Sequence, residues 1–294
     1  MYNNITKTTN DLIAKSEGLT YLGTNASTEG VTDLIKNLGG FFSTKLKTIS
    51  FVFGRNKSRT DSVVSAADLN TFARELVKVR PQIKDIVTSY EYSDIMVYTV
   101  PTIPGLKTNF LIAAKTTSDV LVKYYSPIEN CLEKLDTLVS NIIGDPNYGI
   151  SARPVKEDQE CAKISDTLNK ELNNIIGTKN LQDATKFKNV FPNMKSVLET
   201  YEILVNVSSG TTLDNLIKLS KRCSDIDDKI KALVDSIERS EITLTKPVIN
   251  KLSFELENTA NAVTYLVSFS EIYNKLVNCV TSLTNPKVLS NSLD

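Results

Sequence analysis

The chain has 294 residues, 34 lysines and arginines against 34 aspartates and glutamates, and neither histidine nor tryptophan. Without histidine it cannot build a Ser-His-Asp triad, a Cys-His nucleophile pair or a histidine-ligated metal site. A formal net charge of zero argues against a protein that coats nucleic acid over its whole surface, because such coating needs a large cationic excess. Composition therefore favours a non-enzymatic protein, and we expect no catalytic residue, no cofactor and no metal.

The N-terminal sequence MYNNITKTTNDLIAK lacks a cationic stretch followed by an apolar one, so we expect no secretory signal. No run reaches the roughly 20 apolar residues that a membrane-spanning helix needs. The four cysteines lie singly, at positions 131, 161, 223 and 279, and form no CxxC pair of the kind that binds zinc. Each falls at an apolar or semi-apolar helical position, so we expect reduced, buried thiols.

The first feature in chain order is an apolar and basic segment at residues 31–59. Basic amphipathic segments are typical of membrane-surface binding, and the same cations can contact a phosphate backbone without reading base sequence. An ordinary core helix followed by a solvated basic loop is the simpler interpretation. Membrane and nucleic-acid contact stay as alternatives, and the residues that would make it are Phe41, Phe42, Lys45, Lys47, Arg55, Lys57 and Arg59.

Residues 65–90 predict a helix that Pro81 kinks or restarts. The run IMVYTV at residues 95–100 is the only β-like one, and Pro101 and Pro104 follow it. An extended segment and a short helix both fit this run. Because one strand does not make a sheet, we expect at most an extended arm near residues 91–106.

Three further helical stretches occupy the middle of the chain. Residues 110–124 predict a helix that meets the next one at a kink, and Ser126-Pro127-Ile128-Glu129 reads as a capping box that opens this next helix. Gly144 and the residues after it end that helix. Residues 155–176 predict another helix, and residues 181–207 predict two shorter ones divided at Pro192.

The clearest signal lies at residues 211–238, where apolar residues alternate at intervals of three and four through three heptads. This pattern predicts a helix with one apolar seam, made of Leu216, Leu219, Cys223, Ile226, Ile230, Leu233 and Ile237. A second long helix begins near Pro247 and runs to about residue 283, roughly 50 Å at 1.5 Å per residue. The short link between the two favours an antiparallel hairpin.

These elements predict an all-α fold: an elongated helical bundle with long antiparallel coiled-coil-like helices and one extended arm. We divide the chain into an N-terminal amphipathic and basic segment (1–64), a helical domain (65–147) and a C-terminal helical bundle with the long hairpin (155–294). The Gly-, Pro- and Asn-rich stretch at residues 144–155 marks the boundary between the last two.

A chain without His or Trp, rich in Asn, Ser and Thr, with GFFSTKLKTISFVFGRNKSRTD at residues 40–61 and VPTIPGLKTNF at residues 100–110, resembles structural or internal virion proteins of large tailed bacteriophages. The resemblance covers about the first 150 residues and includes no motif whose residues can be transferred. It implies a non-enzymatic virion component, made in the host cytoplasm, that contacts copies of itself or other proteins of the particle.

Overall fold

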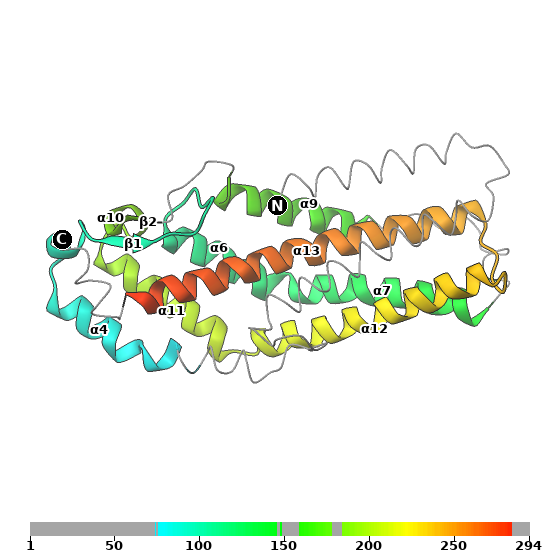
Figure 1. The fold of residues 1–294 in the computed structure, drawn as a ribbon, viewed down its shortest axis with the longest axis horizontal. Helices are drawn as coiled ribbons and strands as arrows, with labels where there is room; N and C mark the ends of the chain where they lie inside the picture. Colours follow the sequence, from blue (N-terminus) through cyan, green and yellow to red (C-terminus); the bar gives the residue numbers. More distant parts are fainter. Residues whose placement is uncertain (1–73, 75, 146–147, 149–158, 178–183, 284–294) are drawn as a thin grey trace.

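The computed structural model describes residues 74, 76–145, 148, 159–177 and 184–283 (Figure 1). Helices make up 80% of these residues, and a two-stranded sheet accompanies them. The predicted helical fold class is therefore confirmed. The predicted N-terminal segment, residues 1–64, lies outside the described residues.

The molecule is elongated, and its longest helices lie side by side along its length (Figure 1). In chain order they are α4 (Arg80–Ser89), α5 (Tyr92–Ile95), β1 (Thr99–Pro101), α6 (Phe110–Lys123), α7 (Tyr125–Gly144), α9 (Glu160–Ile175), β2 (Ala184–Lys186), α10 (Phe187–Val190), α11 (Met194–Ser209), α12 (Thr212–Glu238) and α13 (Lys246–Ser282).

Several predicted helix boundaries are confirmed at the residues that set them. Pro81 lies in the first turn of α4, where its missing N–H costs nothing, and Pro192 separates α10 from α11. Pro247 opens α13 in the same way. The Ser126 capping box is wrong: α7 already begins at Tyr125 without a side-chain cap, because the chain passes almost helically through Tyr124 from α6.

The segment at residues 91–106 contains both a short helix and a strand. α5 begins with a capping box in which the side chains of Glu91 and Asp94 each accept a hydrogen bond from the other's main-chain N–H. β1 then pairs antiparallel with β2, and Val100 lies opposite Thr185. Our expectation that this run makes no sheet is wrong, because the partner strand, Ala184-Thr185-Lys186, has no apolar run and follows some 80 residues later.

The long helices α12 and α13 both form where the heptads predict them, but each packs mainly against a different neighbour. α12 lies along α7, whereas α13 lies along α9 and also contacts α6, α7 and α11 (Figure 1). The link between them reverses the chain direction, yet the apolar seam of α12 faces α7 and not α13. The predicted hairpin pairing of the two seams is therefore wrong.

One continuous apolar core runs through the bundle and includes buried residues from every described helix that is longer than one turn. Helices on both sides of residues 144–155 contribute to it, since α7 packs against α12 and α13. That predicted boundary lies mostly outside the described residues, and the division into domains stays a prediction.

Candidate functional site

The predicted seam of α12 is fully used inside the chain. Its members are buried, with exposed fractions between 0 and 4%: Leu216, Leu219, Cys223, Ile226, Ile230, Leu233 and Ile237. Apolar residues repeated every 3.5 positions on average keep one edge of a helix against its partner. Because this edge already faces α7, a neighbouring molecule cannot reach it without opening the bundle.

Polar contacts fix how α12 lies beside α7. The Lys229 ammonium donates to an Asp136 carboxylate oxygen and, at 3.0 Å, to the Ser140 hydroxyl. Nearer the start of both helices, Arg222 lies near the Tyr125 hydroxyl, which bonds to the Glu129 carboxylate. Burial, and then the Glu129 charge, raise the pKa of Tyr125. Because Tyr125 and Arg222 both come earlier in their helices than Asp136 and Lys229, α7 and α12 run parallel.

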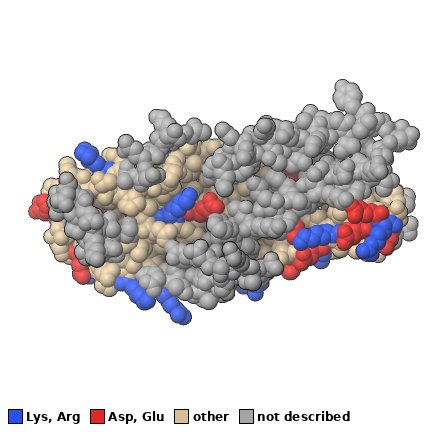
Figure 2. All heavy atoms as spheres, viewed as in Figure 1, with Lys and Arg blue, Asp and Glu red and all other residues tan. Residues whose placement is uncertain are grey.

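The outer face of α12 is exposed and carries charges of both signs: Asp214, Lys218, Lys221, Asp225, Asp228, Asp235 and Arg239. Beside it, Lys231 bonds to Asp227 at 2.6 Å and to Asp228 at 3.0 Å, and these bonds raise the pKa of Lys231. Figure 2 shows basic and acidic side chains alternating at the end of the molecule where α7 and α12 lie. A face of mixed charge suits a protein surface better than a phosphate backbone.

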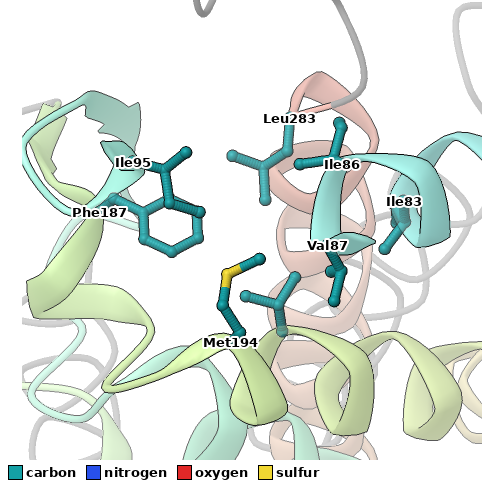
Figure 3. A pocket seen from close by; sticks show the side chains of 8 residues that line it. Ile83, Ile86, Val87, Ile95, Phe187, Met194 and Leu283 are labelled. Atoms are coloured by element: carbon teal, nitrogen blue, oxygen red, sulfur yellow. The ribbon is translucent and has the colours of Figure 1, made fainter. Parts of the chain in front are cut away.

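An apolar crevice lies at the opposite end of the molecule, where α4 and α5 meet α10, α11 and the residue after α13 (Figure 3). Its walls are the side chains of Ile83, Ile86, Val87, Ile95, Phe187, Met194, Val197 and Leu283. Its cavity volume is about 10 Å³, roughly the space of one water molecule. No polar side chain lines it, so the crevice offers neither a proton donor nor an acceptor for chemistry.

Buried hydroxyls join the helices near this end. Tyr273 of α13 donates to the main-chain oxygen of Leu204 at 3.0 Å and shares a further hydrogen bond with Ser208. Tyr201 donates to the main-chain oxygen of Leu76 at 2.6 Å. Burial raises the pKa of both tyrosines. Both hydroxyls are thus held neutral as structural donors.

The cysteines differ from expectation in part. Cys131 and Cys161 are joined in a disulfide, whereas Cys223 and Cys279 are buried thiols outside any disulfide among the described residues. The expectation of reduced thiols at 131 and 161 is wrong, because the packing of α7 against α9 brings their Cα atoms to 5.9 Å. Burial raises the pKa of Cys279 to about 11, which keeps this thiol protonated and unreactive at neutral pH.

Two glutamates of α13 are half-buried. Desolvation raises the pKa of Glu257, and it raises the pKa of Glu271 despite the opposing charge of Lys275. Within the described ranges, no three His, Cys, Asp or Glu side chains come close enough together to hold a metal ion. The described helices include none with the length and apolar character to cross a membrane.

The basic amphipathic segment cannot be placed against these features. Phe41, Phe42, Lys45, Lys47, Arg55, Lys57 and Arg59 all lie outside the described residues, so membrane and nucleic-acid contact stay predictions. Sequence reasoning missed the crevice because its eight lining residues come from α4, α5, α10, α11 and the residue after α13. No local pattern marks such a convergence.

The chain was compared with known proteins at three levels. No protein-family profile, no curated protein sequence and no solved structure matches this chain.

Proposed function

We propose that this protein is a non-enzymatic structural or assembly component of a multi-subunit particle, and that it acts through protein–protein contacts of a rigid helical rod. The observation that supports this most directly is α13. Its 37 residues extend over about 55 Å and contact four other helices along the way. A helix held on several sides over this length resists bending, which suits a spacer or strut.

The parallel pair of α7 and α12 adds to this stiffness. We interpret its heptad-spaced seam, with Lys229–Asp136 at the rim, as a coiled-coil-like pairing inside the bundle. The seam then serves packing inside the chain, and the outer face of α12 makes the contacts with neighbouring proteins in the particle. A neighbouring protein with charges of opposite order would bind there by complementary ion pairs.

We propose that the particle is a virion, because the sequence resembles virion proteins of large tailed bacteriophages. Under this proposal the protein is incorporated into the virion after synthesis in the host cytoplasm. Mass spectrometry of the purified particle tests the role directly, because a structural component is present there in stoichiometric copies. Absence from the particle, together with a monodisperse monomer in light scattering, contradicts the proposal.

Charge reversal tests the surface. Lys218→Glu with Lys221→Glu reverses two cations on the outer face of α12, and Lys163→Glu with Lys170→Glu changes the net charge equally on exposed positions of α9. We expect the first pair, and not the second, to lower incorporation into the particle several-fold. Equal incorporation of both variants would place the contact elsewhere on the molecule.

A further inference from the structure

α12 carries a second line of regularly spaced residues, on the side of the helix opposite its buried seam. We call this line the outer stripe. All its members are exposed, and intervals of four and three residues alternate between them: Asp214, Lys218, Lys221, Asp225, Asp228, Ala232 and Asp235. Side chains at such intervals lie along one edge of a helix, where a second helix can pack lengthwise. Because α12 lies at one edge of the bundle, a second helix can approach the outer stripe from outside (Figure 1).

The charges in the middle of the outer stripe change sign once. The first two are the cations Lys218 and Lys221, and the next two are the carboxylates Asp225 and Asp228. In the opposite chain direction the carboxylates come first. Two copies of α12 that run antiparallel can therefore place Lys218 of each copy beside Asp228 of the other. The same alignment places Lys221 beside Asp225. A parallel pair would instead bring like charges together, which opposes association.

The rest of this alignment brings no like charges together along the outer stripe. Asp214 of each copy lies beside the small, neutral side chain of Ala232 of the other. Asp228 is accessible to a cation from outside the chain, since its side chain is 73% exposed. Lys231 bonds to Asp228 at 3.0 Å but lies closer, at 2.6 Å, to Asp227. The charges that the antiparallel pair needs are therefore in solvent and within reach of a second molecule.

We propose that the partner of the outer face of α12 is a second copy of this chain, docked antiparallel through the outer stripe. The pairing rests on the proposed function, which makes this face the contact surface in the particle, and it names the neighbour. Exposed ion pairs are individually weak and are screened by salt. Because a twofold axis repeats both pairings, four ion pairs act together. The copies therefore associate reversibly, and more strongly at high protein concentration and low ionic strength.

Sedimentation equilibrium of the full chain at low ionic strength, over a range of protein concentrations, tests this pairing. We expect Lys218→Glu, and separately Asp228→Lys, to lower the association constant about tenfold or more, because each puts like charges together at two places in the contact. The double variant restores opposite charges and should associate within about threefold of wild type. Lys170→Glu, at an exposed position of α9, changes the net charge as Lys218→Glu does and should leave association unchanged.

Mixing the two single variants makes the test independent of whether the double variant folds. Each copy of Lys218→Glu then meets a copy of Asp228→Lys with opposite charges at both pairings. The mixture should therefore associate more strongly than either variant associates with itself, and added salt should weaken this association as it weakens that of wild type.

A wild-type chain that is monomeric at every concentration up to about 1 mM overturns the pairing. So does a mixture of the single variants that associates no better than each variant alone. Both results leave the particle role standing, because mass spectrometry of the particle tests that role separately. Absence from the particle, with association that follows the charge swaps, contradicts the particle role and leaves the pairing standing.

Discussion

Tyr273 donates a hydrogen bond to the main-chain oxygen of Leu204, a residue 69 positions earlier in the sequence, and thereby ties the second half of α13 to α11. The Tyr273 side chain is 4% exposed. The same oxygen also accepts from the Ser208 hydroxyl at 2.9 Å, so two side-chain hydroxyls, one of them from another helix, converge on it. The aromatic ring supplies apolar packing at the same position.

Removing this hydroxyl isolates its contribution. Tyr273→Phe keeps the ring but deletes the bonds to Leu204 and Ser208, so we expect the free energy of unfolding to fall by about 1–2 kcal/mol. Thermal unfolding followed by circular dichroism measures the change. Tyr90→Phe removes an exposed hydroxyl, 44% of the residue being in solvent, and should leave the midpoint unchanged. Equal midpoints for both variants would contradict the structural role of the bond.

The end of α12 offers a position where glycine is preferred over the natural residue. Ser240 has a φ of 60°, and the following N–H, that of Glu241, donates to the Ser236 oxygen at 3.0 Å, as in a Schellman motif. We expect Ser240→Gly to stabilise the protein by about 0.5–1 kcal/mol, since glycine adopts this conformation without steric cost. Chemical denaturation measures this change in the free energy of unfolding.

The same substitution inside the helix is the control for that prediction. Ser224 is exposed in the middle of α12, where glycine costs backbone entropy. Ser224→Gly should therefore lower the unfolding free energy, by an amount on the order of 0.5 kcal/mol. The two variants should change stability in opposite directions, and a loss in both would show that Ser240 does not need the left-handed conformation.

Position 105 requires glycine, because the main chain there lies close to the loop after α9. Its φ is 82°, its oxygen accepts from the Gly177 N–H at 2.7 Å, and an added Cβ would lie 2.9 Å from the Gly177 oxygen. We expect Gly105→Ala to destabilise the protein by roughly 2 kcal/mol through strain and loss of this close approach. Gly144→Ala, at a helical position with open space around it, should be neutral or slightly stabilising. Thermal unfolding of both variants measures the two changes in stability.

A half-buried carboxylate makes stability depend on pH. Burial raises the pKa of Glu257 above its ordinary value of 4.5, so the folded state favours the protonated form. The stability from this protonation is fully present below pH 4.5 and is lost as the pH rises through the higher folded-state pKa. Glu257→Gln should therefore stabilise the protein at pH 7, by less than about 1 kcal/mol because solvent screens the group.

Measuring the unfolding midpoint from pH 4 upward checks this expectation. The difference between Glu257→Gln and wild type should be small at the acidic end and grow toward neutral pH. Glu202→Gln changes an exposed carboxylate on α11 and should give no such pH-dependent difference. A constant offset for Glu257→Gln across the pH range would point to packing instead of charge.

Local patterns in the sequence predicted the helices well but not their neighbours. The heptads of α12, Pro81 in α4 and Pro192 before α11 each act within a few residues, so their effects could be read directly. The pairing of α12 with α7 depends on contacts such as Lys229–Asp136, which are 93 residues apart. Periodicity shows that a seam exists and does not show what covers it.

Neither the strand pair nor the disulfide was predicted, and the reason is the same for both. β2 is three residues long, and only its pairing with Thr99-Val100-Pro101 makes it a strand. Four cysteines allow several pairings or none, so their spacing alone could not select Cys131 with Cys161. The crevice likewise forms only when separate elements converge. The candidate contact residues from Phe41 to Arg59 lie outside the described residues and stay untested.

The parallel arrangement of α7 and α12 has a consequence for biosynthesis. A ribosome completes α7 about 90 residues before it completes the stretch of α12 that covers it. During that interval the apolar edge of the nascent helix has no partner and can bind other unfinished chains. We therefore expect the yield of correctly assembled protein to depend on chaperones during translation, and more so when synthesis is slow.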